Sequence, residues 1–226
     1  MSGPLSGWTI VFDLDGTLVD SAPDLMNATN HVLSLAGRRA VTLGEIRHMI
    51  GSGAKAMMRQ GFALTGEPAE ESEIDALWDP FIAHYKANIA VDSAVFPGSE
   101  VALKELLELG AVLAVCTNKM EALARQVLDE LGVAGYFSAC LGADSVPERK
   151  PNGDHIMRTI QAVNGDTAKA IMIGDSQTDE KAAQNAGLPF IFVPFGYGPG
   201  TQDQVHAAAV VDDYSAMVSA ILQIAS

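Results

Sequence analysis

The chain has 226 residues, of which 48% are hydrophobic, so it can form one large domain or a core that carries a smaller insertion. Its 14 basic and 28 acidic residues give a net charge of −14, which argues against nucleic acid and anionic membrane surfaces as partners. No run approaches the ~20 apolar residues that span a membrane, and the first seven residues lack the features of a secretory signal. Cys116 and Cys140, both in apolar runs, are expected to be buried free thiols of a cytoplasmic protein.

The first predicted element is a buried strand over residues 8–12, which ends in two carboxylates. Asp13 and Asp15 stand two residues apart, so the alternation of an extended chain places them on the same side. Gly16 ends the strand, and both groups therefore emerge at its carboxyl end, where open α/β sheets bind ligands. Two carboxylates this close repel each other unless a cation or a proton lies between them. Taken alone, the motif also fits a solvated junction between a strand and a turn.

Residues 20–91 are predicted to form an inserted all-α subdomain, because they show helical periodicity and no apolar strand. This segment is too long for a simple crossover between two strands. Thr42, with Glu45 three residues later, has the spacing of a capping box, and residues 65–68 separate two helices. The predicted helices cover residues 24–35, 42–50, 54–64 and 70–89.

After residue 95, strands and helices alternate, which predicts a parallel sheet with right-handed crossovers. The predicted strands cover residues 112–117, 139–143, 170–175, 190–193 and 209–211. The amphipathic helical patterns cover residues 100–109, 120–131, 154–163, 179–186 and 214–224. Glycines follow four of these patterns and are expected to terminate the helices: Gly110, Gly132, Gly165 and Gly187.

Polar side chains gather at the carboxyl ends of three predicted strands and in one loop before a helix. In a parallel sheet these positions face one crevice. The set comprises Asp13, Asp15, Thr117, Asn118, Lys150, Asp175 and Asp179. Carboxylate oxygens suit Mg²⁺, lysine and threonine suit phosphate oxygens, and an aspartate held in line can attack phosphorus. Each residue alone also fits an ordinary helix cap, turn or solvated loop.

These motifs, in this order, resemble those of the haloacid dehalogenase-like hydrolase superfamily over essentially the whole chain. The stretch from Asp13 to Asp24 is especially similar to the phosphoglycolate phosphatases of that superfamily. The resemblance implies an α/β fold, with a Rossmann-like parallel sheet core formed by residues 1–19 and 92–226. It also implies that residues 20–91 are the helical cap found at that point in one large subgroup.

The resemblance assigns a role to each motif residue. Asp13 would be the nucleophile that forms an aspartyl-phosphate, and Asp15 the acid that protonates the leaving group and then the base that activates water. Thr117, the backbone N–H of Asn118 and Lys150 would bind the transferring phosphoryl oxygens. The Mg²⁺ ligands would be Asp13, Asp15 through its backbone carbonyl, Asp175, and Asp179 through the metal's water shell.

Departures from related branches favour a phosphatase. Asp15 favours phosphate esters, because the dehalogenases lack an aspartate there and the phosphonate-cleaving branch has alanine. The related sugar-phosphate mutases carry a histidine where this chain has Leu25. The expected activity is therefore Mg²⁺-dependent hydrolysis of a small organic phosphate, with 2-phosphoglycolate first. The alternatives are a phosphosugar mutase or phosphotransferase, another sugar-phosphate phosphatase, or a non-catalytic phosphate-binding module.

The loop over residues 51–55 is the expected site of substrate selection. Its glycines suit a tight turn that lets backbone N–H groups approach an anion. Ser52, Gly53, Lys55 and nearby Arg59 would meet the carboxylate at the non-phosphate end of 2-phosphoglycolate. The mutases carry an arginine in this loop, whereas this chain has Lys55, which equally fits a surface lysine near a helix N-terminus.

Overall fold

The computed structural model describes residues 3–198 and 205–226, which divide into two compact units. One unit comprises the described residues up to Asp20 and from Val95 onward, and the other comprises Ser21–Ala94. Residues 1–2 and 199–204, which fall within the core ranges expected from the sequence, lie outside the described residues. Within those described ranges, no helix combines the length and apolar character needed to cross a membrane.

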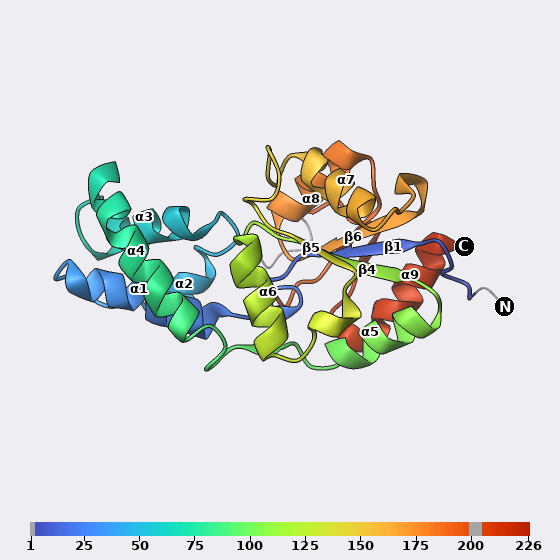
Figure 1. Ribbon diagram of the computed structural model, residues 1–226, viewed down its shortest axis with the longest axis horizontal. Helices are drawn as coiled ribbons and strands as arrows, with labels where there is room; N and C mark the ends of the chain where they lie inside the picture. Colours follow the sequence, from blue (N-terminus) through green and yellow to red (C-terminus); the bar gives the residue numbers. More distant parts are fainter. Residues whose placement is uncertain (1–2, 199–204) are drawn as a thin grey trace. The chain divides into compact units, whose positions relative to one another are not determined.

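The larger unit is built on a parallel sheet, which confirms the predicted α/β core (Figure 1). In the described residues the sheet has six strands in the order β5-β4-β1-β6-β7-β8. Their bounds are Thr9–Phe12 (β1), Val112–Cys116 (β4), Ala139–Leu141 (β5), Ala170–Gly174 (β6), Phe190–Phe192 (β7) and Ala209–Val210 (β8). Numbered along the chain, this is the 3-2-1-4-5-6 order, which reverses between β1 and β6. The carboxyl ends of these two strands therefore border a crevice.

Helices cover both faces of the sheet, and this burial explains its apolar strands (Figure 1). One face is covered by α7 (Gly153–Ala162) and α8 (Gln177–Ala186). The other face is covered by α5 (Ser99–Glu108), α6 (Glu121–Glu130) and α9 (Met217–Ala225). Short 3₁₀ helices lie at Ala134–Tyr136, Thr167–Lys169 and Tyr214–Ala216. Val11 and Met172 of the central strands pack with Ile156 of α7 and Ala182 of α8. Both faces of the sheet are thus buried, as is usual for parallel strands.

Three of the four predicted helix-terminating glycines are confirmed. Gly110, Gly132 and Gly187 have positive φ angles of 94°, 72° and 71° just after their helices. The prediction for Gly165 is wrong, because α7 ends earlier and Asn164 adopts the left-handed conformation, with φ at 54°. Gly165 instead packs closely: a Cβ there would lie 2.3 Å from Thr9 Oγ1.

Residues 21–94, all of them described, contain four helices and no strand except the first residue of β3. The helices are α1 (Ala22–Leu35), α2 (Leu43–Arg47), α3 (Ala54–Thr65) and α4 (Glu71–Ala87). The capping box is confirmed, since Thr42 N–H donates to Glu45 Oε2 at 2.7 Å and Glu45 N–H donates to Thr42 Oγ1 at 3.3 Å. Helix α2 is shorter than predicted, ending at Arg47.

The end of this helical unit is bound to its beginning by Asp24, a buried residue of α1. Asp24 Oδ2 accepts hydrogen bonds from Ser93 N–H at 2.9 Å and Ser93 Oγ at 2.6 Å, and both of its carboxylate oxygens lie 3.1 Å from Asp92 N. The flanking segments β2 (Val19–Asp20) and β3 (Ala94–Val95) form a two-stranded sheet. The chain thus leaves and returns at neighbouring points.

Candidate active site

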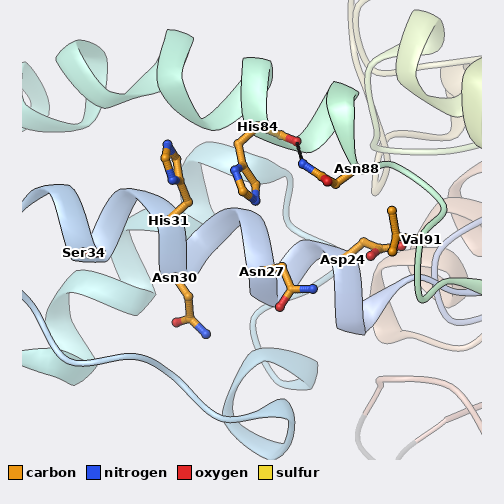
Figure 2. Close-up of a pocket in the computed structure, with 8 residues that line it drawn as sticks. All are labelled: Asp24, Asn27, Asn30, His31, Ser34, His84, Asn88 and Val91. Carbon is orange, nitrogen blue, oxygen red and sulfur yellow. Dashed lines mark hydrogen bonds between the residues drawn. The ribbon is translucent and has the colours of Figure 1, made fainter.

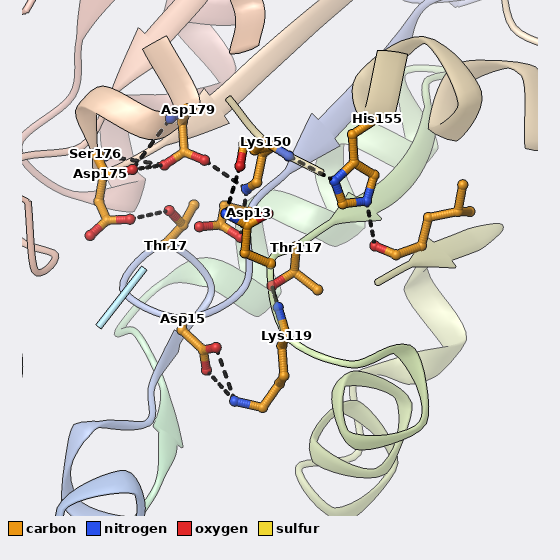
Figure 3. A network of polar contacts seen from close by, with 12 residues as sticks. Asp13, Asp15, Thr17, Thr117, Lys119, Lys150, His155, Asp175, Ser176 and Asp179 are labelled. Carbon is orange, nitrogen blue, oxygen red and sulfur yellow. Dashed lines mark hydrogen bonds and ion pairs between the residues drawn. The ribbon is translucent and has the colours of Figure 1, made fainter. Parts of the chain in front are cut away.

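The carboxyl ends of β1, β4 and β6 gather the candidate side chains predicted in the core (Figure 3). Asp13 follows β1, and its N–H donates to Ile173 O at 2.9 Å. Thr117 follows β4, and its N–H donates to Leu141 O at 3.1 Å. Asp175 follows β6 directly, so three adjacent strands each present one polar residue at the same edge.

Lys150 joins two of the carboxylates at the centre of the site. Its Nζ lies 2.9 Å from Asp13 Oδ1 and donates to Asp179 Oδ1 at 2.6 Å. Burial alone would lower the pKa of Lys150, which is 2% exposed, but the charges of Asp13 and Asp179 outweigh it and raise that pKa above its usual range. The ammonium therefore stays charged at the pH at which enzymes act.

The backbone and hydroxyl groups of three segments hold Asp175. Thr17 Oγ1 donates to its Oδ1 at 3.2 Å, and the N–H groups of Tyr197 and Gly198 donate to its Oδ2 at 2.6 and 3.2 Å. Gly16 passes against this carboxylate with a φ of 89°, and a Cβ there would lie 2.4 Å from Asp175 Oδ2. Glycine is therefore required at position 16 for both conformation and space.

The buried carboxylates form a group that could hold a cation. Within the described ranges, ligand oxygens of Asp13, Asp175 and Asp179 all lie within 4.8 Å of one another. Burial, countered by Lys150, raises the pKa of Asp13 to about 7, and burial with the charges of Asp179 and Asp13 raises the pKa of Asp175 to about 8. One ammonium does not balance three carboxylates, and an all-oxygen donor set suits Mg²⁺, so these residues fit that ion.

Asp179 is held on both of its oxygens. Besides Lys150, it binds Ser176 through Oδ2, which accepts from the Ser176 N–H at 3.2 Å and the Ser176 Oγ at 2.6 Å. The Ser176 hydroxyl in turn accepts from the Asp179 N–H at 3.3 Å, which completes a capping box at the start of α8. This cap starts the helix two residues before the predicted position and fixes the Asp179 side chain.

Asp15 lies outside this carboxylate group and is paired with a lysine that the sequence analysis did not select (Figure 3). Lys119 Nζ donates to Asp15 Oδ1 at 2.8 Å and to Oδ2 at 2.9 Å. The two side chains are 6% and 12% exposed, for Lys119 and Asp15 respectively. The Lys119 N–H also donates to Thr117 Oγ1 at 3.2 Å, which fixes the start of its side chain.

The loop that carries Lys150 is held by His155 and Asn118. The Lys150 N–H donates to His155 Nδ1 at 3.3 Å, and His155 Nε2 lies 3.3 Å from Leu141 O. Burial and the Lys150 charge lower the pKa of His155 to about 4, so the ring is neutral and its Nε2 carries the proton. Asn118 Nδ2 donates to Lys150 O at 3.0 Å, and the Lys150–Pro151 peptide is cis.

Among the described residues that hold the site, sequence reasoning missed Thr17, Lys119, His155, Ser176, Tyr197 and Gly198. Ser176 could have been found from the sequence, because its three-residue spacing to Asp179 is that of a capping box. Lys119 directly follows two selected residues, but a lysine at that position also fits a solvated loop. No local pattern distinguishes His155 or Tyr197, whose partners come from other elements.

The residues selected in the 51–55 loop and nearby belong to the helical unit, where the two cations are already paired. Lys55 Nζ lies 2.6 Å from Asp75 Oδ1, and Arg59 contacts the Glu71 carboxylate twice at 2.6 Å. Lys55 also lies 5.3 Å from the Trp78 ring centroid. Ser52 is exposed and Gly53, with a φ of 90°, precedes the first residue of α3.

A second candidate is a pocket of about 420 Å³ between α1 and α4 (Figure 2). It is lined by Asp24, Asn27, Asn30, His31, Ser34, His84, Asn88 and Val91. The rings of His31 and His84 stack with their centroids 4.4 Å apart, and burial with the His31 charge lowers the pKa of His84. Asp24 already binds the backbone of residues 92–93, so the pocket offers mainly neutral polar groups.

Comparisons with known proteins agree on one family. The model of the haloacid dehalogenase-like hydrolase family matches residues 10–193. The chain is 42% identical to the phosphoglycolate phosphatase of Agrobacterium fabrum over 98% of this chain and 95% of that protein. It is also 42% identical to the phosphoglycolate phosphatase of Caulobacter vibrioides, over 93% and 89%. A crystal structure of a predicted phosphoglycolate phosphatase from Haemophilus somnus superposes with a TM-score of 0.88 at 27% identity, covering 95% of this chain and 97% of that one.

Proposed function

The chain belongs to the haloacid dehalogenase-like hydrolase family, and from this we propose that it is a Mg²⁺-dependent phosphatase that hydrolyses 2-phosphoglycolate. The substrate is proposed from the relatives of Agrobacterium fabrum and Caulobacter vibrioides, which are named phosphoglycolate phosphatases. The observation that carries the chemistry is the buried Lys150 ammonium between Asp13 and Asp179, beside Asp175. We place the activity in the cytoplasm, on a small phosphate ester.

The reaction begins with binding of the phosphoryl group at the carboxyl end of the sheet. The Thr117 hydroxyl, the Asn118 backbone N–H and the Lys150 ammonium bind its oxygens. These groups are preorganised, because Thr117 and Lys150 are buried and their backbones are hydrogen-bonded to Leu141 and His155. Fixed donors of this kind stabilise the negative charge that spreads over the phosphoryl oxygens during transfer.

Asp13 then attacks phosphorus with one carboxylate oxygen, and the bond from phosphorus to the ester oxygen breaks. Asp15, which takes up a proton before this step, gives it to the departing oxygen, so glycolate leaves and an aspartyl-phosphate remains on Asp13. Asp15, now a carboxylate, removes a proton from water, which attacks phosphorus and releases inorganic phosphate. The sum is one ester and one water converted into one alcohol and one phosphate.

Magnesium would be held by Asp13 and Asp175, and it would add positive charge beside the phosphoryl oxygens. Asp179, whose oxygens already accept hydrogen bonds from Lys150 and Ser176, is better placed to hold the ion's water shell and to position Lys150. The pKa of Asp13, raised to about 7 without a cation, would fall when the ion binds, so Asp13 would attack as a carboxylate.

The proposal is tested by phosphate release from purified protein. We expect release from 2-phosphoglycolate in Mg²⁺ and none in EDTA, with a higher kcat/KM than for a panel of short sugar phosphates. A higher kcat/KM for a sugar phosphate would replace the substrate, and formation of an isomeric sugar phosphate without phosphate release would support the mutase. Inactivity on every ester with several divalent metals would leave the non-catalytic phosphate-binding module.

A further inference from the structure

We propose that Lys119 binds the carboxylate of the leaving group and so selects an acidic phosphate ester. The inference rests on the proposed function, which gives Asp15 the task of protonating the leaving oxygen. It deepens that proposal by assigning recognition of the substrate's acidic end to a residue of the sheet unit. No sequence motif pointed to Lys119 for this task.

The first step is the position of the ammonium. A general acid lies within hydrogen-bond distance of the oxygen that it protonates, so the ester oxygen must bind next to Asp15. Lys119 Nζ is 2.8 and 2.9 Å from the two Asp15 oxygens. In 2-phosphoglycolate a single methylene carbon separates the ester oxygen from the carboxylate. The acidic end of the substrate therefore reaches the same place as the Lys119 ammonium.

The second step is the division of the cations in the site. Figure 3 shows Lys150 joined to the Asp13 and Asp179 side of the network and Lys119 joined to Asp15. Lys150 is thereby directed to the phosphoryl group, and Lys119 to the group that leaves. The two charged ends of the substrate are matched by two separate ammonium groups.

The third step is preorganisation. The Lys119 side chain is 6% exposed, so its charge is little screened by water, and its N–H is bound to Thr117 Oγ1 at 3.2 Å. Its backbone therefore belongs to the same loop as the proposed phosphate ligands Thr117 and Asn118. Lys55, in contrast, is 41% exposed. A buried and anchored ammonium loses less conformational freedom on binding a carboxylate than an exposed one.

The contacts of Lys119 with Asp15 also fit a second role, in which Lys119 only orients the Asp15 side chain and does not bind the substrate. The two roles differ in their dependence on substrate. An orienting lysine affects every ester equally, whereas a lysine that binds the leaving group affects only those with a carboxylate. The pair 2-phosphoglycolate and 2-hydroxyethyl phosphate separates the two roles, because the second ester has a neutral hydroxymethyl group in place of the carboxylate.

The experiment compares kcat/KM for both esters in wild type, Lys119→Met and Lys119→Arg. In Lys119→Met we expect the ratio of 2-phosphoglycolate to 2-hydroxyethyl phosphate to fall about 30-fold or more, mainly through KM, as for loss of a charged hydrogen bond. Lys119→Arg keeps the charge and should retain part of the preference. The control is Lys104→Met on α5, whose Nζ lies near the Tyr136 ring, 5.8 Å from its centroid, and which should leave the ratio unchanged.

The outcomes are distinct from those of the proposed function. A wild-type protein that hydrolyses neither ester overturns both proposals. An active wild type with equal losses on both esters in Lys119→Met shows that Lys119 only positions Asp15, and the inference is then wrong. Full activity on both esters in Lys119→Met also overturns it. If circular dichroism shows that Lys119→Met does not fold, Lys119→Arg decides. A lower ratio than in wild type supports the inference, and an unchanged ratio overturns it.

Discussion

Asp13 and Lys150 form a buried ion pair, in which Asp13 Oδ1 and Lys150 Nζ lie 2.9 Å apart. The two residues are distant in the sequence, because the helical unit, β4 and β5 all lie between them along the chain.

Replacing Asp13 with asparagine keeps the shape of the side chain but removes the nucleophile. We expect Asp13→Asn to lose more than about a hundredfold in kcat, given the size of losses in covalent catalysis. Phosphate release measures it, with circular dichroism to check the fold. Asp154→Asn, exposed on α7, is the matched control, and residual activity above one hundredth would contradict the nucleophile assignment.

Removing the Lys150 ammonium should raise the barrier more than it weakens binding. Lys150→Ala is expected to cost about 3 kcal/mol of transition-state stabilisation, the range for one lost donor at a developing charge. Lys150→Arg should restore only part, because a planar fork does not replace a point charge between Asp13 and Asp179. The measurement is kcat/KM for 2-phosphoglycolate. Wild-type values in both variants would make Lys150 a structural residue.

The buried carboxylates should make the free energy of unfolding of the metal-free protein fall as the pH rises. The pKa values of Asp13 and Asp175, raised from 3.8 to about 7 and about 8, mean that the folded state binds more protons than the unfolded state. Their contribution is full below about pH 4 and is lost as the pH passes through about 7 to 8. His155, with a pKa of about 4, is already neutral there.

Calorimetry in EDTA from about pH 6 to about pH 8.5 checks this dependence. The wild-type Tm should fall more steeply than that of Asp175→Asn, which removes one buried charge. Saturating Mg²⁺ should raise the wild-type Tm most at the high-pH end. If the Tm of the two proteins falls equally with pH, the Asp175 charge does not contribute to the pH dependence, and the prediction is wrong.

His155 should act on substrate binding through the loop of Lys150. In His155→Phe the Lys150 N–H loses its acceptor at 3.3 Å, which costs about 1 to 3 kcal/mol of stability for a buried donor left unmade. We expect a lower Tm and a raised KM, with a smaller change in kcat. His155→Gln, which can still accept the hydrogen bond, should recover part of the KM. A change in kcat alone would contradict this positioning role.

Selection by the 51–55 loop stays a prediction that one variant can test. Lys55→Ala should raise KM for acidic substrates while sparing p-nitrophenyl phosphate, if this loop meets the substrate's acidic end. Because Lys55 is exposed and paired with Asp75, we expect the effect to be smaller than that of Lys119→Met. Equal effects on both substrates, or none, would remove the loop from the specificity site.

Residues at strand ends could be predicted because their position follows from local pattern and sheet topology. Asp13, Thr117 and Asp175 each come directly after an apolar strand, and parallel strands place such residues at one edge. The parallel sheet, the helices of the insertion and the capping box at Thr42 were accessible in the same way, because each depends on neighbouring residues.

What the sequence could not supply depends on contacts between distant segments. Lys119 and Asp15 are 104 positions apart, and the Tyr197 N–H reaches Asp175 across 22 positions. Neither pairing leaves a local pattern. The prediction that Gly165 terminates a helix is wrong for a related reason. Glycine is required at this position by the close approach of Thr9, and not by the end of α7.

Asp24 gives the insertion a closed boundary. Because this carboxylate binds the backbone of residues 92–93, the first turn of α1 and the segment that follows α4 are fixed to each other. Changes of sequence inside residues 21–94 then need not alter the path of the chain through the sheet. The helical unit can therefore accept substitutions between these two points without displacing the strands on either side of it.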